Sequence, residues 1–216
     1  MATLMDSTRD RILESIVREL KNKYRCHTIV LYGSRARGLA TSTSDYDVFG
    51  VRRNGEKTRI AKKQNGFYWD VFVYSENDLR KLNDQHLSWR GARILHGDSQ
   101  YGRHLLLRIQ KLVNKPHKPE PQYQINILKV WAQKEMDRCR VNDIQGLYRR
   151  AEFHNALIEH YFVIRKRRFL GPKAAFAWLE KNDPETFRLI ERALKKPSNL
   201  SLLQSAASRV YRVSLE

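Results

Sequence analysis

The most constraining feature of this chain is a segment with a glycine–serine pair at its start and two aspartates at its end. Residues 27–32 form a β-branched, apolar run typical of a buried strand, which delivers Gly33 and Ser34 to the carboxyl end of that strand. After ten intervening residues, Asp45 and Asp47 form a D-x-D pair. Because alternate residues of a strand point to the same side, both carboxylates are expected on one face. The segment therefore predicts a strand, a tight turn and a second strand that carries acidic groups.

This arrangement suits the metal-dependent transfer of a nucleotide. A transferred nucleotidyl group carries concentrated negative charge that divalent cations neutralise, and Mg2+ prefers hard oxygen ligands. Gly33 allows the backbone to approach a phosphate closely, and the Ser34 hydroxyl and nearby backbone N–H groups offer hydrogen bonds to a triphosphate. Arg35 and Arg37 lie beside the turn, where a guanidinium binds phosphate oxygens bidentately. These four residues are the predicted nucleotide ligands of the first half.

A third carboxylate is expected on a neighbouring strand. The segment 67–74 is aromatic and β-branched except for Asp70, and a charge in such a segment is costly to bury unless it is paired or bound to a metal. We predict that Asp45, Asp47 and Asp70 are the catalytic residues and that they hold two Mg2+ ions. ATP or another nucleoside triphosphate is the expected co-substrate. The sequence leaves open whether Asp70 is a metal ligand or the general base that deprotonates the acceptor hydroxyl.

The spacing of these residues resembles the G-S-x10-D-x-D signature of the DNA polymerase beta-like nucleotidyltransferase superfamily. Within that superfamily, Gly-Ser-Arg-Ala-Arg-Gly at 33–38 is similar to small bacterial stand-alone nucleotidyltransferases. The resemblance implies a catalytic domain with a mixed sheet and helices. It also implies transfer of a nucleoside monophosphate, AMP above all, to an acceptor hydroxyl with release of pyrophosphate.

The second half carries a looser resemblance. Residues 160–178 are similar to the helical domain of streptomycin/spectinomycin adenylyltransferases. A lysine of a Pro-Lys pair touches the ATP phosphates in those enzymes, which implies this role for Lys173. An arginine one helix earlier also contacts the nucleotide there, and this chain has His160 at that position. The family's third carboxylate is a glutamate that acts as base, whereas Asp70 is one methylene shorter. The resemblance thus adds Lys173 and His160 to the predicted nucleotide-binding residues.

Periodicity and helix breakers predict an α+β chain of two domains. An amphipathic helix is expected from a capping-box-like start at Ser7. The basic stretch 57–63 is expected as an exposed loop or a hairpin extension. The other elements predicted in the first half are strands near 27–33, 46–53 and 67–74 and helices near 76–83, 88–96 and 99–114.

A proline-rich segment marks the predicted domain boundary. Three prolines between 115 and 121 cannot continue a helix. We therefore place a nucleotidyltransferase domain at 1–115 and an all-α helical bundle at 118–216. The helices expected in the bundle lie near 122–139, 143–168, 173–181, 184–195 and 199–212.

Charge indicates the class of partner. The chain has 41 Lys and Arg against 23 Asp and Glu, a net charge of +18 at pH 7. Both halves share the excess, with 22 basic and 12 acidic residues in 1–115 and 19 and 11 in 116–216. A distributed positive charge attracts polyanions, so tRNA or another RNA is the preferred acceptor. An aminoglycoside antibiotic is a polycation that this field repels unless a local acidic pocket receives it.

Three alternative functions remain at this stage. The first is an aminoglycoside-type antibiotic adenylyltransferase. The second is a ribonuclease, because Arg149 and His154 resemble the R-x4-H motif of HEPN ribonucleases, which could protonate a scissile RNA phosphate. The third is a non-catalytic RNA-binding module, which the presence of all three carboxylates disfavours.

Cysteine usage and hydropathy predict a cytoplasmic, soluble protein. Cys26 and Cys139 are far apart and lack a metal-ligand pattern, so neither a disulfide framework nor a zinc site is indicated. Charged residues appear almost at once, which argues against a signal peptide. No apolar run approaches the ~20 residues that span a bilayer, so no membrane partner is expected.

Overall fold

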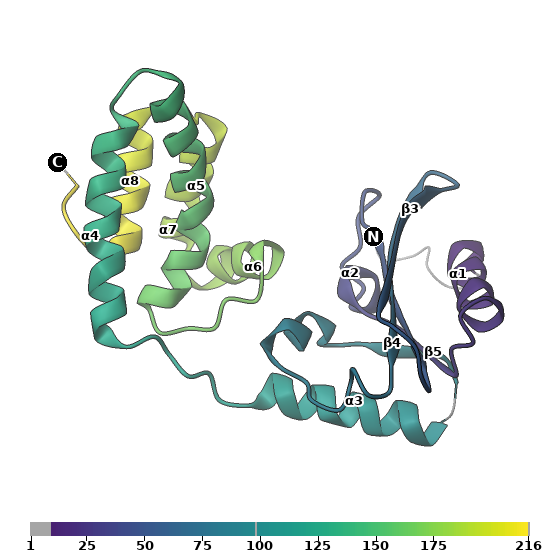
Figure 1. Cartoon of the computed structure of the whole chain (residues 1–216). Coiled ribbons are helices and arrows are strands. Elements are labelled where there is room, and N and C mark those ends of the chain that lie inside the picture. Colours follow the sequence, from purple (N-terminus) through teal and green to yellow (C-terminus); the bar gives the residue numbers. More distant parts are fainter. Residues whose placement is uncertain (1–9, 98, 216) are drawn as a thin grey trace. The chain divides into compact units, whose positions relative to one another are not determined.

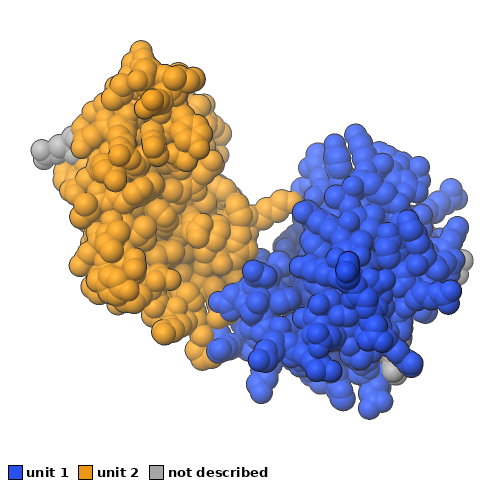
Figure 2. Space-filling model, viewed as in Figure 1, with its two compact units in different colours: residues 1–115 blue, residues 116–216 orange. Residues whose placement is uncertain are grey.

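A computed structural model describes residues 10–97 and 99–215 of the chain. The chain divides into two compact units, residues 1–115 and 116–216, which are coloured separately in Figure 2. The first unit contains a five-stranded mixed sheet with helices, and the described residues of the second form helices and no strand. This arrangement confirms the predicted α+β fold. No helix in the described part of the chain is both long enough and apolar enough to span a membrane.

The sheet of the first unit places Asp47 beside Asp70. Its strand order is β3-β4-β2-β1-β5, with β2 and β4 parallel and the other neighbours antiparallel. Register pairs Asp47 of β2 with Asp70 of β4. The strands predicted near 27–33, 46–53 and 67–74 are confirmed. The strands are β1 (Thr28–Leu31), β2 (Tyr46–Arg52), β3 (Thr58–Gln64), β4 (Phe67–Ser75) and β5 (Arg93–Gly97).

Helices cover the two faces of this sheet unequally (Figure 1). Helix α1 (Arg11–Asn22) buries Ile16 and Leu20 against one face, together with Val48 and Val71. The other face packs Phe49 and Val51 with η1 (Asp84–Trp89) and α3 (Ser99–Asn114). Asp47 and Asp70 point to this second face, because they alternate with residues that face α1. Asp10 caps α1 by accepting from two backbone N–H groups, while the predicted start at Ser7 lies outside the described residues.

Two predicted helices of the first unit are absent from the structure, and a third segment follows one of its two predicted alternatives. Residues 76–83 form turns instead of a helix. The predicted helix 88–96 is also wrong, because Gly91 has φ +70° and the following segment pairs as β5 with β1. A short apolar run is compatible with either a helix or a strand, and here pairing with β1 makes it a strand. Of the two alternatives for 57–63, the hairpin extension is confirmed and the exposed loop is wrong. The stretch forms most of β3, which is joined to β4 through Asn65 and Gly66 at φ 52° and 82°, a pair that suits a tight hairpin.

The second unit is the helical bundle that the sequence predicts. Its core includes Phe153, Leu157 and Tyr211, all fully buried. Helix α5 ends before the predicted residue 168, because Lys166 adopts a left-handed conformation at φ 56°. The five helices are α4 (Gln122–Cys139), α5 (Ile144–Ile164), α6 (Pro172–Asn182), α7 (Pro184–Lys195) and α8 (Leu200–Tyr211).

The two cysteines are buried and free, one in each unit. Burial raises the pKa of both thiols to about 11. Only about one thiol in a thousand is therefore a thiolate at pH 8. We expect native protein at pH 8 to resist iodoacetamide, with labelling of Cys26 and Cys139 only after unfolding or as the pH approaches 11. Mass spectrometry of the native protein would contradict this expectation if it found either cysteine alkylated as fast as a free thiol.

Candidate active site

The glycine–serine turn packs directly against the second aspartate of the D-x-D pair. Gly33 has φ +72° and begins the short helix α2 (Gly33–Ala36), in which Ser34 is buried. A Cβ atom at Gly33 would overlap the carboxylate of Asp47. The Tyr32 N–H also donates to the Asp47 carbonyl at 2.9 Å. Only glycine satisfies both the backbone angle and the close approach, so this turn holds Asp47 in place.

The other two aspartates stand near Asp47 in different ways. Asp45 is exposed and lies in the loop just before β2, two residues ahead of Asp47. Asp70 is in register with Asp47 on the neighbouring parallel strand. Burial first, and then the negative charges of Asp47 and Asp70, raise the pKa of the Tyr32 phenol. The Tyr32 phenol therefore lies within electrostatic range of both carboxylates.

Asp70 is engaged by a residue that the sequence did not single out. Arg59 of β3 donates through Nε and Nη2 to the two carboxylate oxygens of Asp70, at 2.8 and 3.1 Å. This bidentate pair raises the pKa of Arg59. Asp70 is thus half-buried, and its pairing with Arg59 offsets the free-energy cost of burying a lone charge. Its availability to a substrate or metal depends on exchange with Arg59.

The donor set suits a hard divalent cation. Carboxylate oxygens of Asp45, Asp47 and Asp70 are the ligand type that Mg2+ prefers, and register brings two of them together. In the arrangement of the described residues, no three His, Cys, Asp or Glu side chains form a cluster that could hold a metal ion. Asp70 is ion-paired with Arg59 at 2.8 Å instead. The three-carboxylate metal site therefore stays a prediction.

The two arginines beside the turn contact backbone carbonyls. Arg35 donates to the carbonyls of Ser44 at 2.7 Å and Asp45 at 3.0 Å, and its guanidinium lies 3.8 Å from the centroid of the Tyr46 ring. Arg35 therefore positions the loop that leads into the D-x-D pair. Arg37 donates to the Arg90 carbonyl at 3.5 Å. Phosphate binding by either arginine stays a prediction.

Lys173 and His160 belong to the second unit. Lys173 is exposed at the start of α6, directly after Gly171 and Pro172. His160 is half-buried: its Nδ1 is 2.6 Å from the Tyr211 hydroxyl and its ring packs edge-on to Trp131. Burial lowers the pKa of His160, so the ring is neutral near pH 7. Nucleotide binding by these two residues stays a prediction.

The ribonuclease alternative finds little structural support. His154 is 5% exposed inside the bundle, with Nδ1 2.6 Å from the Arg150 carbonyl. Arg149 is paired with Glu152 at 3.0 Å. A general acid must reach the proton acceptor directly or through one water, and a histidine buried in this way does not present its ring to RNA.

Comparison with known proteins identifies the family of the chain. The sequence matches the family described as nucleotidyltransferase domain over residues 13–136, more than half of the chain. A crystal structure of a nucleotidyltransferase-like protein from Exiguobacterium sibiricum 255-15 is similar, with 14% identity, 93% of this chain and 74% of that chain covered, and a TM-score of 0.43. That likeness is too low to carry an argument. No protein of curated function matches the chain. On the family match, which spans Gly33, Ser34 and all three aspartates, the chain belongs to the nucleotidyltransferase domain family.

Proposed function

We propose that the first unit is the catalytic domain and that it transfers AMP, or another nucleoside monophosphate, from a nucleoside triphosphate to a hydroxyl of RNA. The observation that carries the proposal is the packing of Gly33 against the Asp47 carboxylate, with Asp70 in register beside it. A tight turn for phosphate and acidic groups for metal thus occupy one end of the sheet.

The residues divide the work as follows. The backbone at Gly33 and the Ser34 hydroxyl bind the triphosphate, and Arg35 keeps the loop before Asp45 in position. Two Mg2+ ions bound by Asp45 and Asp47 would offset the charge that develops on the phosphates. Asp70, once released from Arg59, acts as a third ligand or accepts the proton of the acceptor hydroxyl. The acceptor oxygen bonds to the α-phosphorus as the bond to pyrophosphate breaks.

RNA as acceptor is supported by the surface next to Asp70. On the face of the sheet that carries Asp70, β3 and β4 interleave cations with aromatic rings. Lys63 lies 5.1 Å from the Tyr68 ring and Arg59 lies 5.2 Å from the Phe72 ring. Tyr68 is 54% exposed. Exposed rings among cations are the usual platform for single-stranded nucleic acid, because bases stack on the rings while cations meet the phosphates.

Neighbouring lysines provide a matched test of this surface. Lys63 lies on the Asp70 face, whereas Lys62 points to the other face and pairs with Glu19 at 2.6 Å. We expect Lys63→Ala to weaken binding of single-stranded RNA and to reduce its salt slope by about 0.7, and Lys62→Ala to change neither. Tyr68→Ala should weaken binding by roughly five- to a hundredfold, since one base–aromatic stack contributes about 1–3 kcal/mol. Equal effects of the two lysine substitutions would contradict an acceptor surface on the Asp70 face.

A labelling assay tests the proposed function. Wild-type protein is incubated with Mg2+, nucleoside triphosphate labelled at the α-phosphorus, and total RNA. We expect label on RNA and release of pyrophosphate. Label on streptomycin and none on RNA would favour the antibiotic adenylyltransferase. Binding of RNA with no label transferred from any nucleoside triphosphate would contradict the proposal and favour a non-catalytic RNA-binding module.

The helical unit enters this proposal only through Lys173 and His160. The resemblance to streptomycin/spectinomycin adenylyltransferases suggests that both contact the nucleotide, and Lys173 is exposed as that role requires. A cytoplasmic location also remains part of the proposal.

A further inference from the structure

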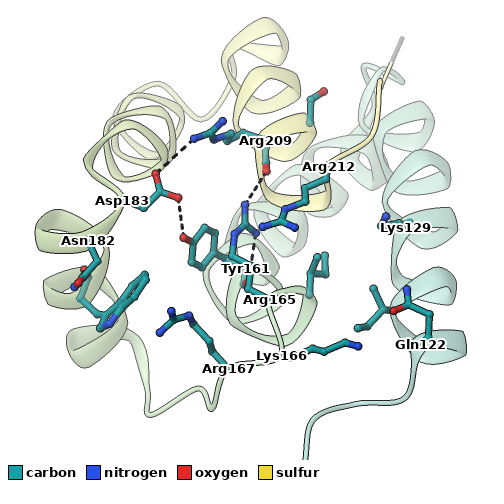
Figure 3. A pocket seen from close by; sticks show the side chains of 14 residues that line it. Gln122, Lys129, Tyr161, Arg165, Lys166, Arg167, Asn182, Asp183, Arg209 and Arg212 are labelled. Atoms are coloured by element: carbon teal, nitrogen blue, oxygen red, sulfur yellow. Dashed lines mark hydrogen bonds and ion pairs between the residues drawn. The ribbon is translucent and has the colours of Figure 1, made fainter.

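A pocket of about 900 Å3 lies wholly within the second unit (Figure 3). It opens between α4, the end of α5, α6 and the end of α8. Among the described residues that line it, Asp183 is the one carboxylate. Against it stand six cations: Lys129, Arg165, Lys166, Arg167, Arg209 and Arg212. Neither the family match nor the predicted active site assigns a role to this pocket.

Two of these cations form the wall of the pocket. Arg165 donates to the carbonyls of Val210 at 2.9 Å and Arg209 at 3.1 Å, and its guanidinium lies 3.7 Å from the Tyr161 ring centroid. Arg209 pairs with Glu185 at 2.8 Å and lies 3.7 Å from Asp183. The carboxylate of Asp183 also accepts from the Tyr161 hydroxyl at 2.7 Å. The one acid of the lining is therefore already satisfied.

The other four cations lack a carboxylate partner within the described ranges. Lys166, Arg167 and Arg212 are exposed and Lys129 is half-buried. Arg167 lies over the Trp178 ring at 4.5 Å. Figure 3 shows the side chains of Arg165, Arg167 and Arg212 gathered around the same hollow. These four cations thus add positive charge to the pocket that no carboxylate of the described residues pairs with.

The neighbouring positive charges affect the pKa of Arg165, which is half-buried. Burial lowers the pKa of Arg165, and the charges of Arg212 and Arg209 act in the same direction against the opposing effects of Tyr161 and Asp183. An anion in the pocket would relieve this repulsion. Guanidinium groups suit phosphate in particular, because their planar N–H donors match its oxygens bidentately.

We propose that this pocket binds an oligophosphate group, the triphosphate of a free nucleotide or of an RNA 5′ end. The cations come from α4 and from the ends of α5 and α8 and converge on one hollow. This grouping suits a compact oligophosphate, whereas an extended RNA backbone would need cations arranged along a line. A volume of about 900 Å3 is large enough for a nucleotide. The site lies apart from the aspartates in the sequence and does not require them, so its test is independent of the proposed transfer reaction.

The test uses the full chain and inorganic tripolyphosphate in metal-free buffer. Arg167→Ala with Arg212→Ala removes two exposed cations of the pocket, and Lys195→Ala with Lys196→Ala removes two exposed cations at the end of α7 that do not line it. We expect calorimetry to show about tenfold or greater weakening for the first pair, because each charge-assisted hydrogen bond contributes strongly. The second pair should change affinity less than about twofold, as screened, remote charges do. Equal weakening by both pairs would overturn the proposal, because binding would then reflect net charge alone.

Hydrogen exchange locates the site and competition identifies the source of the phosphates. Tripolyphosphate should protect residues 161–167 and 208–212, and protection confined to other segments would overturn the proposal. ATP and an RNA with a 5′-triphosphate are then used to displace the probe. Displacement by both supports either source, and displacement by the triphosphorylated RNA alone supports an RNA end. Equal displacement by the same RNA with a 5′-hydroxyl would overturn the proposal, since the phosphodiester backbone would be the ligand.

Discussion

Asp47→Asn is expected to lower the rate of nucleotidyl transfer by about a thousandfold, which corresponds to roughly 4 kcal/mol of activation free energy. An amide keeps the shape of the side chain against Gly33 but removes the negative charge that a divalent cation requires. Unfolding is measured alongside the rate, so that a loss of transfer is separated from a loss of stability. The rate is measured with nucleotide labelled at the α-phosphorus, and unfolding is followed by heating.

The matched control for this substitution is Asp137→Asn. Asp137 is an exposed residue of α4 paired with Arg140 at 2.9 Å, and the chemical change is the same. We expect full transfer activity from this variant. Retention of more than a tenth of the activity in Asp47→Asn, or equal losses in the two variants, would contradict a catalytic role for Asp47.

Gly33→Ala is expected to impair both folding and transfer. A methyl group at this position overlaps the Asp47 carboxylate, and φ of +72° is unfavourable for alanine. We expect a loss of about 1–3 kcal/mol in the free energy of unfolding. A carboxylate displaced by about 1 Å should also reduce transfer by roughly a hundredfold. Denaturant unfolding and the transfer assay measure the two effects.

Gly38→Ala separates the clash from the backbone strain. Gly38 has φ +70°, but a Cβ atom there would meet nothing within 4 Å. This variant should show the modest destabilisation of a left-handed alanine and nearly normal transfer. If Gly33→Ala behaved like Gly38→Ala, the contact between the turn and Asp47 would have no functional importance.

Local patterns made much of the fold predictable. Hydrophobic periodicity and turn residues are local signals that can be recognised in the sequence. They predicted the strand before Gly33, the spacing to Asp47 and the apolar run around Asp70. The helices of the second unit were predicted well for the same reason: Pro172 and Pro184 stand at helix starts. Family membership then follows from the match over residues 13–136.

The features that sequence reasoning missed depend on tertiary pairing. Arg59 reaches Asp70 only because β3 lies antiparallel to β4, and no linear spacing signals that register. The segment that forms β5 was predicted as helix, since its pairing with β1 is set by the sheet and not by local propensity. The pocket of the second unit brings Lys129 of α4 together with Arg167 and Arg212, which follow the ends of α5 and α8. Periodicity alone does not reveal this grouping.

A crystal of the wild-type protein grown with Mn2+ and a non-hydrolysable ATP analogue tests the central claim most directly. Mn2+ takes the same oxygen ligands as Mg2+ and is located by its anomalous scattering. We predict metal peaks bound by Asp45 and Asp47, a triphosphate on the backbone of Gly33 and Ser34, and Asp70 released from Arg59. Metal and triphosphate bound elsewhere, with the Asp70–Arg59 pair intact, would contradict the account.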